Sequence, residues 1–278
     1  MPKIVHIADY SADWRTENYI DYALGDVIKV KESTFENIED ADMVLFHKLN
    51  IPNADKVIAD LRKRGILTVC WIFDLYHGLP WRSLDEEQFK ADIVFSTGGA
   101  GGKLLRQGIH GPENVMLEGK KEYDIVFVGG SNPKRAKLLN WLQNQYGDRF
   151  HHCGDKKQIR GTELNELFAK TKIVIGDSVP YPNYWSNRIY ETLGRGGFLL
   201  HPRVKGLDEE FTPFKHYVPY RKNKDLKEVI DYYLTHDEER ERIQKAGFEQ
   251  SKKYTYEIRV KQLLNECGIT NNSRRNKS

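Results

Sequence analysis

Cysteine is scarce in this sequence, with Cys70, Cys153 and Cys267 the only three in 278 residues. Their odd number and wide separation exclude a disulfide framework and leave no zinc-binding spacing. Cys70 also lies inside an apolar run, which is typical of a buried core position. We therefore expect a protein of a reducing compartment.

Long apolar segments are absent as well. The longest apolar-rich run, residues 66–73, is far shorter than the about 20 residues that a membrane-spanning helix needs. The first residues, 1–7, enter a strand pattern directly and contain no apolar core of a signal peptide. These absences predict a soluble, cytoplasmic protein with no integral membrane segment.

An excess of one charge sign is also missing. Charged residues make up 30% of the chain, and their signs nearly cancel to a formal net charge of +3. DNA-binding proteins usually present a strongly basic face, so this composition does not require a nucleic-acid partner. Part of the positive excess lies in the tail 271–278, which we expect to be disordered and solubilising; a DNA-binding arm is the alternative.

Several common catalytic motifs are missing. The sequence has no cluster of histidine and carboxylate residues, so we expect no dedicated catalytic metal. It also lacks the complete dinucleotide-binding fingerprint and the lysine pattern of phosphate-binding loops. A nicotinamide-dependent oxidoreductase is therefore disfavoured.

The sequence does contain an alternation of short apolar runs and amphipathic stretches. In the first half it predicts a helix over 52–64 and strands over 4–8, 27–30, 43–46, 67–73, 93–96 and 115–117. In the second half it predicts strands over 124–128, 150–153, 173–175, 198–200 and 217–218. The helices predicted there are 133–146, 162–170, 184–195, 225–235, 237–253 and 256–267. Continuous apolar strands separated by helices favour parallel sheets covered on both faces.

A polar stretch at 118–122 divides this pattern into two halves of similar size. We expect a first α/β domain over 1–118 and a second over 119–255. The helix within 256–270 is expected to cross back to the first domain.

The predicted helix 184–195 has one polar face, formed by Tyr184, Arg188, Glu191 and Arg195. A guanidinium can bind a diphosphate through two hydrogen bonds, and a carboxylate can accept hydrogen bonds from both ribose hydroxyls. Arg188 and Glu191 therefore suit two adjacent parts of one nucleotide. An intrahelical ion pair on a solvated face is the alternative explanation of the same spacing.

Two glycine-containing segments flank predicted helices. Gly129, Gly130 and Ser131 connect a strand to a helix start, a common anion site, and Arg135 adds positive charge. A tight turn is the alternative. The loop 176–182, which includes Asp177 and Ser178, follows another strand, where loops of open α/β sheets form ligand crevices.

Three residues of the first half also follow predicted strands. Asp9, His47 and Asp74 each lie at a carboxyl end, where a carboxylate or imidazole can act as a general base toward an acceptor hydroxyl. A helix cap, a turn or a surface position is the alternative for each of them.

Segments 123–130 and 185–200 resemble the glycosyl transferases group 1 superfamily. The similarity includes Arg135 after the glycine turn and the run that begins at Asn187. The branch that is most similar is related to spore-maturation glycosyltransferases, and 184–202 is also similar to bacteriophage glycosyltransferases. These relatives suggest bacterial or phage-infected host cytoplasm.

The resemblance implies an α/β fold of GT-B architecture, in which two Rossmann-like domains with parallel sheets face each other across a cleft. The second domain binds the nucleotide-sugar in such proteins, the first binds the acceptor, and no metal cofactor is needed. Glu191 matches a family glutamate that binds the donor ribose, and Arg188 matches a residue near the phosphates. Many relatives carry a second glutamate eight residues earlier, where this sequence has Asn183.

We therefore expect a glycosyltransferase that moves a hexose from a nucleotide-diphosphate sugar, a UDP-sugar, to an acceptor hydroxyl. A glycan, a small molecule and a hydroxymethylated base of phage DNA are the alternative acceptors, and both stereochemical outcomes stay open. A non-catalytic nucleotide- or sugar-binding protein on the same scaffold is the alternative function. The expected donor-binding residues are Gly129, Gly130, Ser131, Arg135, Asp177, Ser178, Tyr184, Asn187, Arg188 and Glu191.

Overall fold

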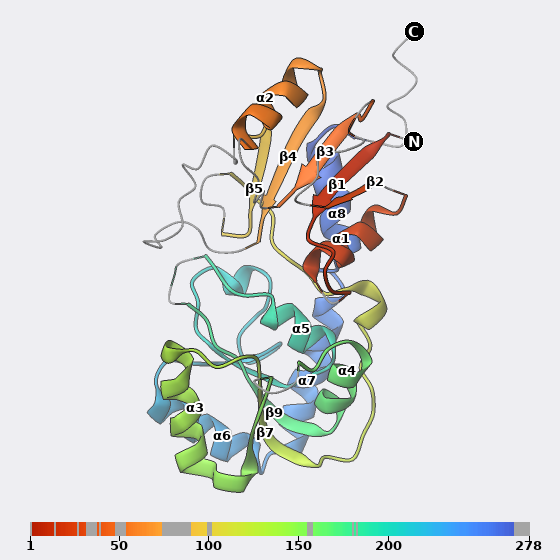
Figure 1. Ribbon diagram of the computed structural model, residues 1–278. Helices are drawn as coiled ribbons and strands as arrows, with labels where there is room; N and C mark the ends of the chain where they lie inside the picture. Colours follow the sequence, from red (N-terminus) through yellow and green to blue (C-terminus); the bar gives the residue numbers. More distant parts are fainter. Residues whose placement is uncertain are drawn as a thin grey trace. The chain divides into compact units, whose positions relative to one another are not determined.

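The chain divides into two compact units, shown in a computed structural model (Figure 1). Unit 1 comprises Met1–Gln107 and Tyr256–Ser278, and unit 2 comprises Gly108–Thr255. The structure describes residues 2–13, 15–26, 28–31, 38, 40–47, 54–73, 90–98, 102–154, 158–179, 181 and 183–269. The expected tail 271–278 lies outside these residues.

Unit 1 is built on a parallel sheet with the strand order β2-β1-β3-β4-β5-β6. Its strands are β1 Ile4–Ala8, β2 Ile28–Lys31, β3 Met43–Phe46, β4 Leu67–Ile72, β5 Ile93–Ser96 and β6 Lys103–Leu104. The chain runs from β1 to β2 and then returns to the other side of β1 to form β3. This reversal of strand order lies between the carboxyl ends of β1 and β3, a place where open α/β sheets bind ligands.

The described helices of unit 1 are α1 Thr16–Leu24, α2 Ala54–Lys63 and α8 Tyr256–Glu266. Helix α2 ends before Gly65, whose φ of 75° is the left-handed conformation that favours glycine after a helix. Helix α8 packs beside α1 (Figure 1) and contributes Tyr256, Val260 and Leu263 to a buried cluster of this unit. The C-terminal helix is thus part of the first unit.

Unit 2 is built on a second parallel sheet, with the strand order β11-β10-β9-β7-β8. Its strands are β7 Tyr123–Val128, β8 Phe150–Cys153, β9 Thr171–Ile175, β10 Leu199–Pro202 and β11 Val218–Tyr220. After β7 and β8 the chain crosses to the other side of β7 to form β9. The reversal of strand order in this sheet therefore lies between the carboxyl ends of β7 and β9.

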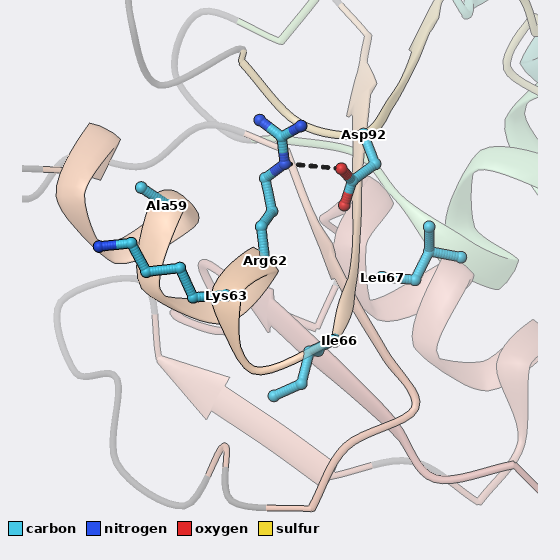
Figure 2. A pocket seen from close by; sticks show the side chains of 7 residues that line it. Ala59, Arg62, Lys63, Ile66, Leu67 and Asp92 are labelled. Carbon is cyan, nitrogen blue, oxygen red and sulfur yellow. Dashed lines mark ion pairs between the residues drawn. The ribbon is translucent and has the colours of Figure 1, made fainter.

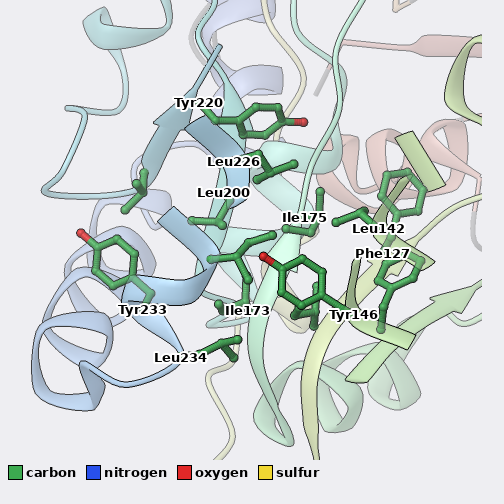
Figure 3. Packing of buried hydrophobic residues seen from close by; sticks show 14 of the residues in the cluster. Phe127, Leu142, Tyr146, Ile173, Ile175, Leu200, Tyr220, Leu226, Tyr233 and Leu234 are labelled. Atoms are coloured by element: carbon green, nitrogen blue, oxygen red, sulfur yellow. The ribbon is translucent and has the colours of Figure 1, made fainter. Parts of the chain in front are cut away.

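The helices of unit 2 cover this sheet (Figure 1). They are α3 Pro133–Tyr146, α4 Gly161–Ala169, α5 Arg188–Gly194, α6 Asn223–Tyr233 and α7 Asp237–Ser251, with short 3₁₀ turns at Gly111–Glu113, Gly147–Arg149 and Leu207–Glu209. Figure 3 shows the largest buried cluster, in which side chains of the sheet strands pack with Leu142 and Tyr146 of α3 and Leu226 of α6. Burial of these apolar side chains fixes the strand ends from which the loops emerge.

The predicted strand pattern is largely confirmed. Strands 4–8, 43–46, 93–96 and 150–153 and helix 133–146 have the predicted bounds, and most other elements differ by one to three residues. The predicted strand 115–117 is wrong, because this stretch forms no strand. Its Val115 carbonyl accepts a 2.7 Å hydrogen bond from the Asn165 side-chain amide, and Met116 packs against Gly196.

The predicted start of helix 184–195 is also wrong, because α5 begins at Arg188. Asn183 has a φ of 59°, a left-handed turn conformation, and residues 184–187 between it and α5 are not helical. Tyr184 therefore lies before the helix, and its side chain is buried, not exposed on a polar helix face. The boundary between the units falls after Gln107, earlier than the expected linker at 118–122.

Candidate active site

A glycine turn occupies the strand-order reversal in unit 2. Gly129 directly follows β7, and its φ of 139° lies in a region that side chains disfavour. The turn is held by two hydrogen bonds to β8: Gly129 N–H donates to the Cys153 carbonyl at 2.8 Å, and His152 Nε2 donates to the Gly129 carbonyl at 2.8 Å. Gly130 and Ser131 continue the turn and are exposed.

Two arginines converge on this turn from different helices. Arg135 lies in the first turn of α3, and Arg188 is the first residue of α5. Both guanidinium groups lie over the ring of Phe127 in β7, with their central carbons 5.3 and 4.9 Å from its centroid. Cation–π attraction of this kind holds the two like charges together at one site.

The carboxylate of Asp177 joins the two arginines. Asp177 follows β9 after one glycine, so the parallel register places it beside the end of β7. Arg135 Nε donates to Asp177 Oδ2 at 2.7 Å, and Arg188 Nη1 forms an ion pair with Asp177 Oδ1. The site therefore combines two positive groups, one negative group and a glycine turn at a single edge of the sheet.

Close packing keeps the Arg188 guanidinium at the turn. A Cβ atom on Gly129 would lie 2.6 Å from Arg188 Nη2, so the guanidinium occupies the space that a side chain would need. Burial, and then the charge of Arg135, lower the pKa of Arg188 to about 9. Arg188 therefore stays positive at neutral pH and can bind an anion.

Glu191 lies one turn after Arg188 on α5 but has different partners. Its Oε2 accepts hydrogen bonds from Arg195 Nε and Nη2 at 3.0 and 2.8 Å, and its Oε1 accepts one from Asn187 Nδ2 at 3.0 Å. Its side chain is 14% exposed. The structure thus holds the Glu191 carboxylate in one orientation with part of its surface still accessible.

The other expected donor-binding residues differ in hydrogen bonding and burial. Ser178 follows Asp177 and donates from its hydroxyl to the Val179 carbonyl at 3.1 Å. Asn187 lies just before α5, and its Oδ1 is buried without a hydrogen-bond partner among the described residues. Tyr184 is buried. Of the expected set, the structure brings Gly129, Gly130, Arg135, Asp177 and Arg188 into direct contact or adjacency.

Asn183, where many relatives are expected to carry a glutamate, has a left-handed backbone. Its left-handed conformation is one that asparagine tolerates better than most residues. Its side-chain oxygen lies against Gly206, where a Cβ atom would come within 2.6 Å, and Gly206 itself has a φ of 88°. Asn183 is therefore packed into a tight turn.

A family model described as glycosyl transferase-like matches residues 120–265, slightly more than half of the chain. The chain belongs to the glycosyl transferase-like family. The match covers β7, the glycine turn, both arginines and α5. The resemblance to the glycosyl transferases group 1 superfamily is thus confirmed, and the protein is a glycosyltransferase. Among curated proteins, no relative matches the sequence.

Solved structures of other glycosyltransferases share the fold. The HepE protein of Anabaena, in complex with UDP and glucose, has a TM-score of 0.66 at 11% identity and covers 96% of this chain and 99% of its own. A sucrose-phosphate synthase of Thermosynechococcus elongatus has a TM-score of 0.64 at 13% identity, with coverage of 96% and 99%. An α1,3-fucosyltransferase has a TM-score of 0.62 at 12% identity, with coverage of 96% and 89%.

These similarities confirm the expected α/β fold of GT-B type, with two Rossmann-like domains. At these low identities they support the fold alone, and the chemistry of this glycosyltransferase has to be argued from its own residues. In the parts of the chain that the structure describes, no helix is both long and apolar enough to cross a membrane.

In unit 1, His47 follows β3 at the strand-order reversal of its sheet. Its Nδ1 lies 2.9 Å from the Trp71 carbonyl and its Nε2 lies 2.8 Å from His6 Nε2, and the side chain is buried. Burial, and then His6, hold the pKa of His47 well below its usual range. With both nitrogens engaged, His47 would have to break a hydrogen bond before it could accept a proton from an acceptor.

Asp9 and Asp74 are the two aspartates expected as base candidates in unit 1. Asp9 follows β1 and forms a 2.7 Å ion pair with Arg15, and its Oδ1 accepts a 2.9 Å hydrogen bond from Ser11 N–H. Hydrogen bonds from Ser11 are the largest cause of a lowered pKa at Asp9, which weakens it as a base. Asp74 lies outside the described residues.

Sequence reasoning missed three residues of the site region in this glycosyltransferase. Phe127 reads as a core strand residue, and nothing in the pattern indicates that arginines lie over its ring. Arg195 reads as a polar helix position, yet it is 1% exposed. His201 follows the apolar run of β10, and its Nε2 is buried without a partner among the described residues. Each depends on contacts between distant segments.

A pocket of about 600 Å³ lies elsewhere in unit 1 (Figure 2). It opens where α2 ends and β4 and β5 begin, and Arg62 Nε pairs with Asp92 Oδ1 there at 2.7 Å. This is the amino-terminal edge of the sheet, opposite the edge where parallel sheets carry their ligand loops. We assign it no role in sugar transfer. It is lined by Ala59, Arg62, Lys63, Gly65, Ile66, Leu67 and Asp92.

Proposed function

We propose that the protein transfers a sugar from a nucleotide-diphosphate sugar to an acceptor hydroxyl and that unit 2 binds the donor. The observation that carries this proposal is the pair Arg135 and Arg188 beside the glycine turn at the strand-order reversal. Two guanidinium groups and exposed backbone of a turn before a helix match the charge and geometry of a diphosphate.

The same arginines suggest how the leaving group departs. Breaking the bond between the sugar and the diphosphate leaves negative charge on the phosphate oxygens, and fixed positive groups stabilise that charge most where water is excluded. Arg188 has a side chain only 17% exposed and Arg135 19%, so both are partly shielded from water. We propose that they act in place of a metal ion.

Glu191 is proposed to bind the ribose of the donor. Its carboxylate is held in place by Arg195 and Asn187 and lies one helical turn from Arg188. A carboxylate accepts hydrogen bonds from both ribose hydroxyls, and this matches the family role of the corresponding glutamate. The donor is proposed to be a UDP-sugar, which the UDP and glucose bound to the structurally similar HepE protein support.

The acceptor is proposed to bind at the carboxyl-terminal edge of the unit 1 sheet. Asp9 follows β1 at this edge, and Asp74 is the further base candidate from the sequence. A glycan or small molecule fits the formal net charge of +3 better than DNA, which usually binds strongly basic faces. Binding to hydroxymethylated DNA that weakens steeply with salt would favour the DNA acceptor instead.

Nucleotide binding by matched arginine variants tests the proposal. We expect Arg188→Met to weaken UDP binding roughly 30-fold or more, because a partly buried charge that grips the diphosphate is lost. Arg149→Met is the control, since Arg149 pairs with Asp124 at the start of β7, at the other end of the strand. Calorimetric titration with UDP measures both. Equal UDP affinity in wild type and Arg188→Met would contradict the proposed site.

A pair of ligands tests the ribose contact. Wild type is expected to bind UDP more tightly than 2′-deoxy-UDP, because the 2′-hydroxyl donates to Glu191. In Glu191→Ala this preference should disappear while pyrophosphate still binds. A preference for UDP that survives in Glu191→Ala would remove Glu191 from the ribose site.

A further inference from the structure

Asp177 holds an unusual position for a residue at a diphosphate site. Its carboxylate pairs with two arginines, most closely with Arg135 through Oδ2 and with Arg188 through Oδ1. The Asp177 side chain is 22% exposed, so the contact is partly shielded from water. The carboxylate thus neutralises the two groups that the proposed function assigns to the donor phosphates.

A carboxylate and a phosphate cannot share these donors without cost. Both are anions, and like charges placed side by side destabilise a complex. Arg135 directs Nε toward Asp177 Oδ2 at 2.7 Å and Nη2 toward Oδ1 at 3.4 Å, so the fork that would bind a phosphate is already occupied. A diphosphate that takes over these donors therefore replaces the Asp177 carboxylate.

We propose that Asp177 is an internal counterion that occupies the phosphate-binding arginines in the empty site and is displaced by the donor diphosphate. This inference rests on the proposed function and changes the role expected for Asp177 from a donor ligand to a competitor. The carboxylate keeps two partly buried positive charges compatible in the free protein. It also weakens binding of the nucleoside diphosphate product, because the returning carboxylate competes for the same guanidinium groups.

The structure also defines the opposing explanation. A carboxylate that merely holds Arg135 and Arg188 in place would improve phosphate binding, because it would order the two side chains in advance. Removing its charge would then weaken the binding of diphosphates. The two roles of Asp177 therefore predict opposite signs for the same substitution.

Asp124 provides a closely matched control. Like Asp177 it pairs with two cations, Arg149 at 2.7 Å and Lys172 at 2.8 Å, and its side chain is 23% exposed. It lies at the start of β7, whereas Asp177 lies beside the end of that strand. Asp124→Asn and Asp177→Asn change the net charge equally, so a general electrostatic effect would appear in both.

The experiment measures the affinities of pyrophosphate and UDP for wild type, Asp177→Asn and Asp124→Asn at low salt. We expect Asp177→Asn to bind both ligands about tenfold or more tightly than wild type, and Asp124→Asn to match wild type. In turnover with the donor, Asp177→Asn should lower KM and, through slower product release, kcat. Equal or weaker binding by Asp177→Asn, or equal tightening by Asp124→Asn, would overturn the counterion role.

Two further variants keep this test independent. Asp177→Ser also removes the charge and serves if Asp177→Asn does not fold. Arg188→Met reports on the proposed function itself. If it binds UDP like wild type, the diphosphate site is wrong; if it weakens UDP binding while Asp177→Asn also weakens it, only the counterion inference fails.

Discussion

At the scale of single residues, the site depends on charged side chains that are partly buried. Arg188 alone would be costly in this position, since its pKa is lowered by burial and by Arg135. The ring of Phe127 and the carboxylate of Asp177 compensate for that cost in the free protein. A glycine turn in place of side chains leaves room for the guanidinium and for a ligand.

His201 gives a residue-scale prediction about pH. It is fully buried, and burial is the largest cause that lowers its pKa to about 3. Because the unfolded chain binds a proton at a pKa near 6.5, His201 contributes its full stability above that value and loses it as pH falls toward 3. Between pH 7.5 and pH 5, this one group should lower the free energy of unfolding by about 2 kcal/mol.

Urea unfolding at pH 7.5 and pH 5 measures this effect. The loss between the two pH values should be smaller in His201→Gln than in wild type, because glutamine does not titrate. His236→Gln is the control, since His236 is exposed. An equal loss in wild type and His201→Gln would show that His201 is not held neutral in the folded protein.

At the scale of elements, Arg195 connects three segments of unit 2. Its guanidinium, 1% exposed, pairs with Glu191 on α5 and with Glu113 in the 3₁₀ turn Gly111–Glu113, and it donates to the Asn165 side chain on α4. The members of such a network depend strongly on one another. Removing the buried cation leaves both carboxylates without their charge partner. The network fixes Glu191 relative to α4 and to the 3₁₀ turn Gly111–Glu113.

Replacing Arg195 should therefore strongly lower the stability of the folded protein. We expect Arg195→Met to lower the free energy of unfolding by about 3–5 kcal/mol, as measured by urea unfolding at pH 7.5. Arg195→Met combined with Glu113→Gln should recover part of that loss, since one carboxylate no longer lacks a partner. A loss below about 1 kcal/mol, the range of exposed ion pairs, would contradict the interdependence of this network.

Individual elements also show how far the sequence predicts the structure. Strands such as 4–8 and 43–46 were predictable because their short apolar runs are buried on both faces of a parallel sheet. The start of α5 was not, because no local pattern indicates that residues 184–187 lie outside the helix. The carbonyl of Val115 bonds to a distant asparagine, which no local pattern indicates.

The same limit holds for the site. The sequence predicts Arg135 as a phosphate ligand because it follows a glycine turn, and Arg188 because it matches a family motif. The structure brings the two side chains together. The bridge formed by Asp177 was not predictable, because it depends on β9 lying next to β7 although β8 follows β7 in the chain. Strand order is a property of the whole sheet, not of any local pattern.

At the scale of the whole molecule, the two units share one arrangement of their sheets. Both sheets are parallel, and in each the strand order reverses beside the first strand, between β1 and β3 and between β7 and β9. Site residues expected from the sequence follow these strands in both units: Asp9 and His47 in unit 1, and Gly129 and Asp177 in unit 2. The fold thus supplies two ligand edges, which suits a reaction between two substrates.

We propose that unit 2 binds a nucleotide-diphosphate sugar through its paired arginines so that the sugar can be transferred. Release of nucleoside diphosphate from a panel of UDP- and GDP-sugars, followed with wild type, Arg188→Met and the control Arg149→Met, tests it most directly. We expect release from at least one UDP-sugar by wild type and Arg149→Met, and a severe loss in Arg188→Met. Equal release by wild type and Arg188→Met would contradict it.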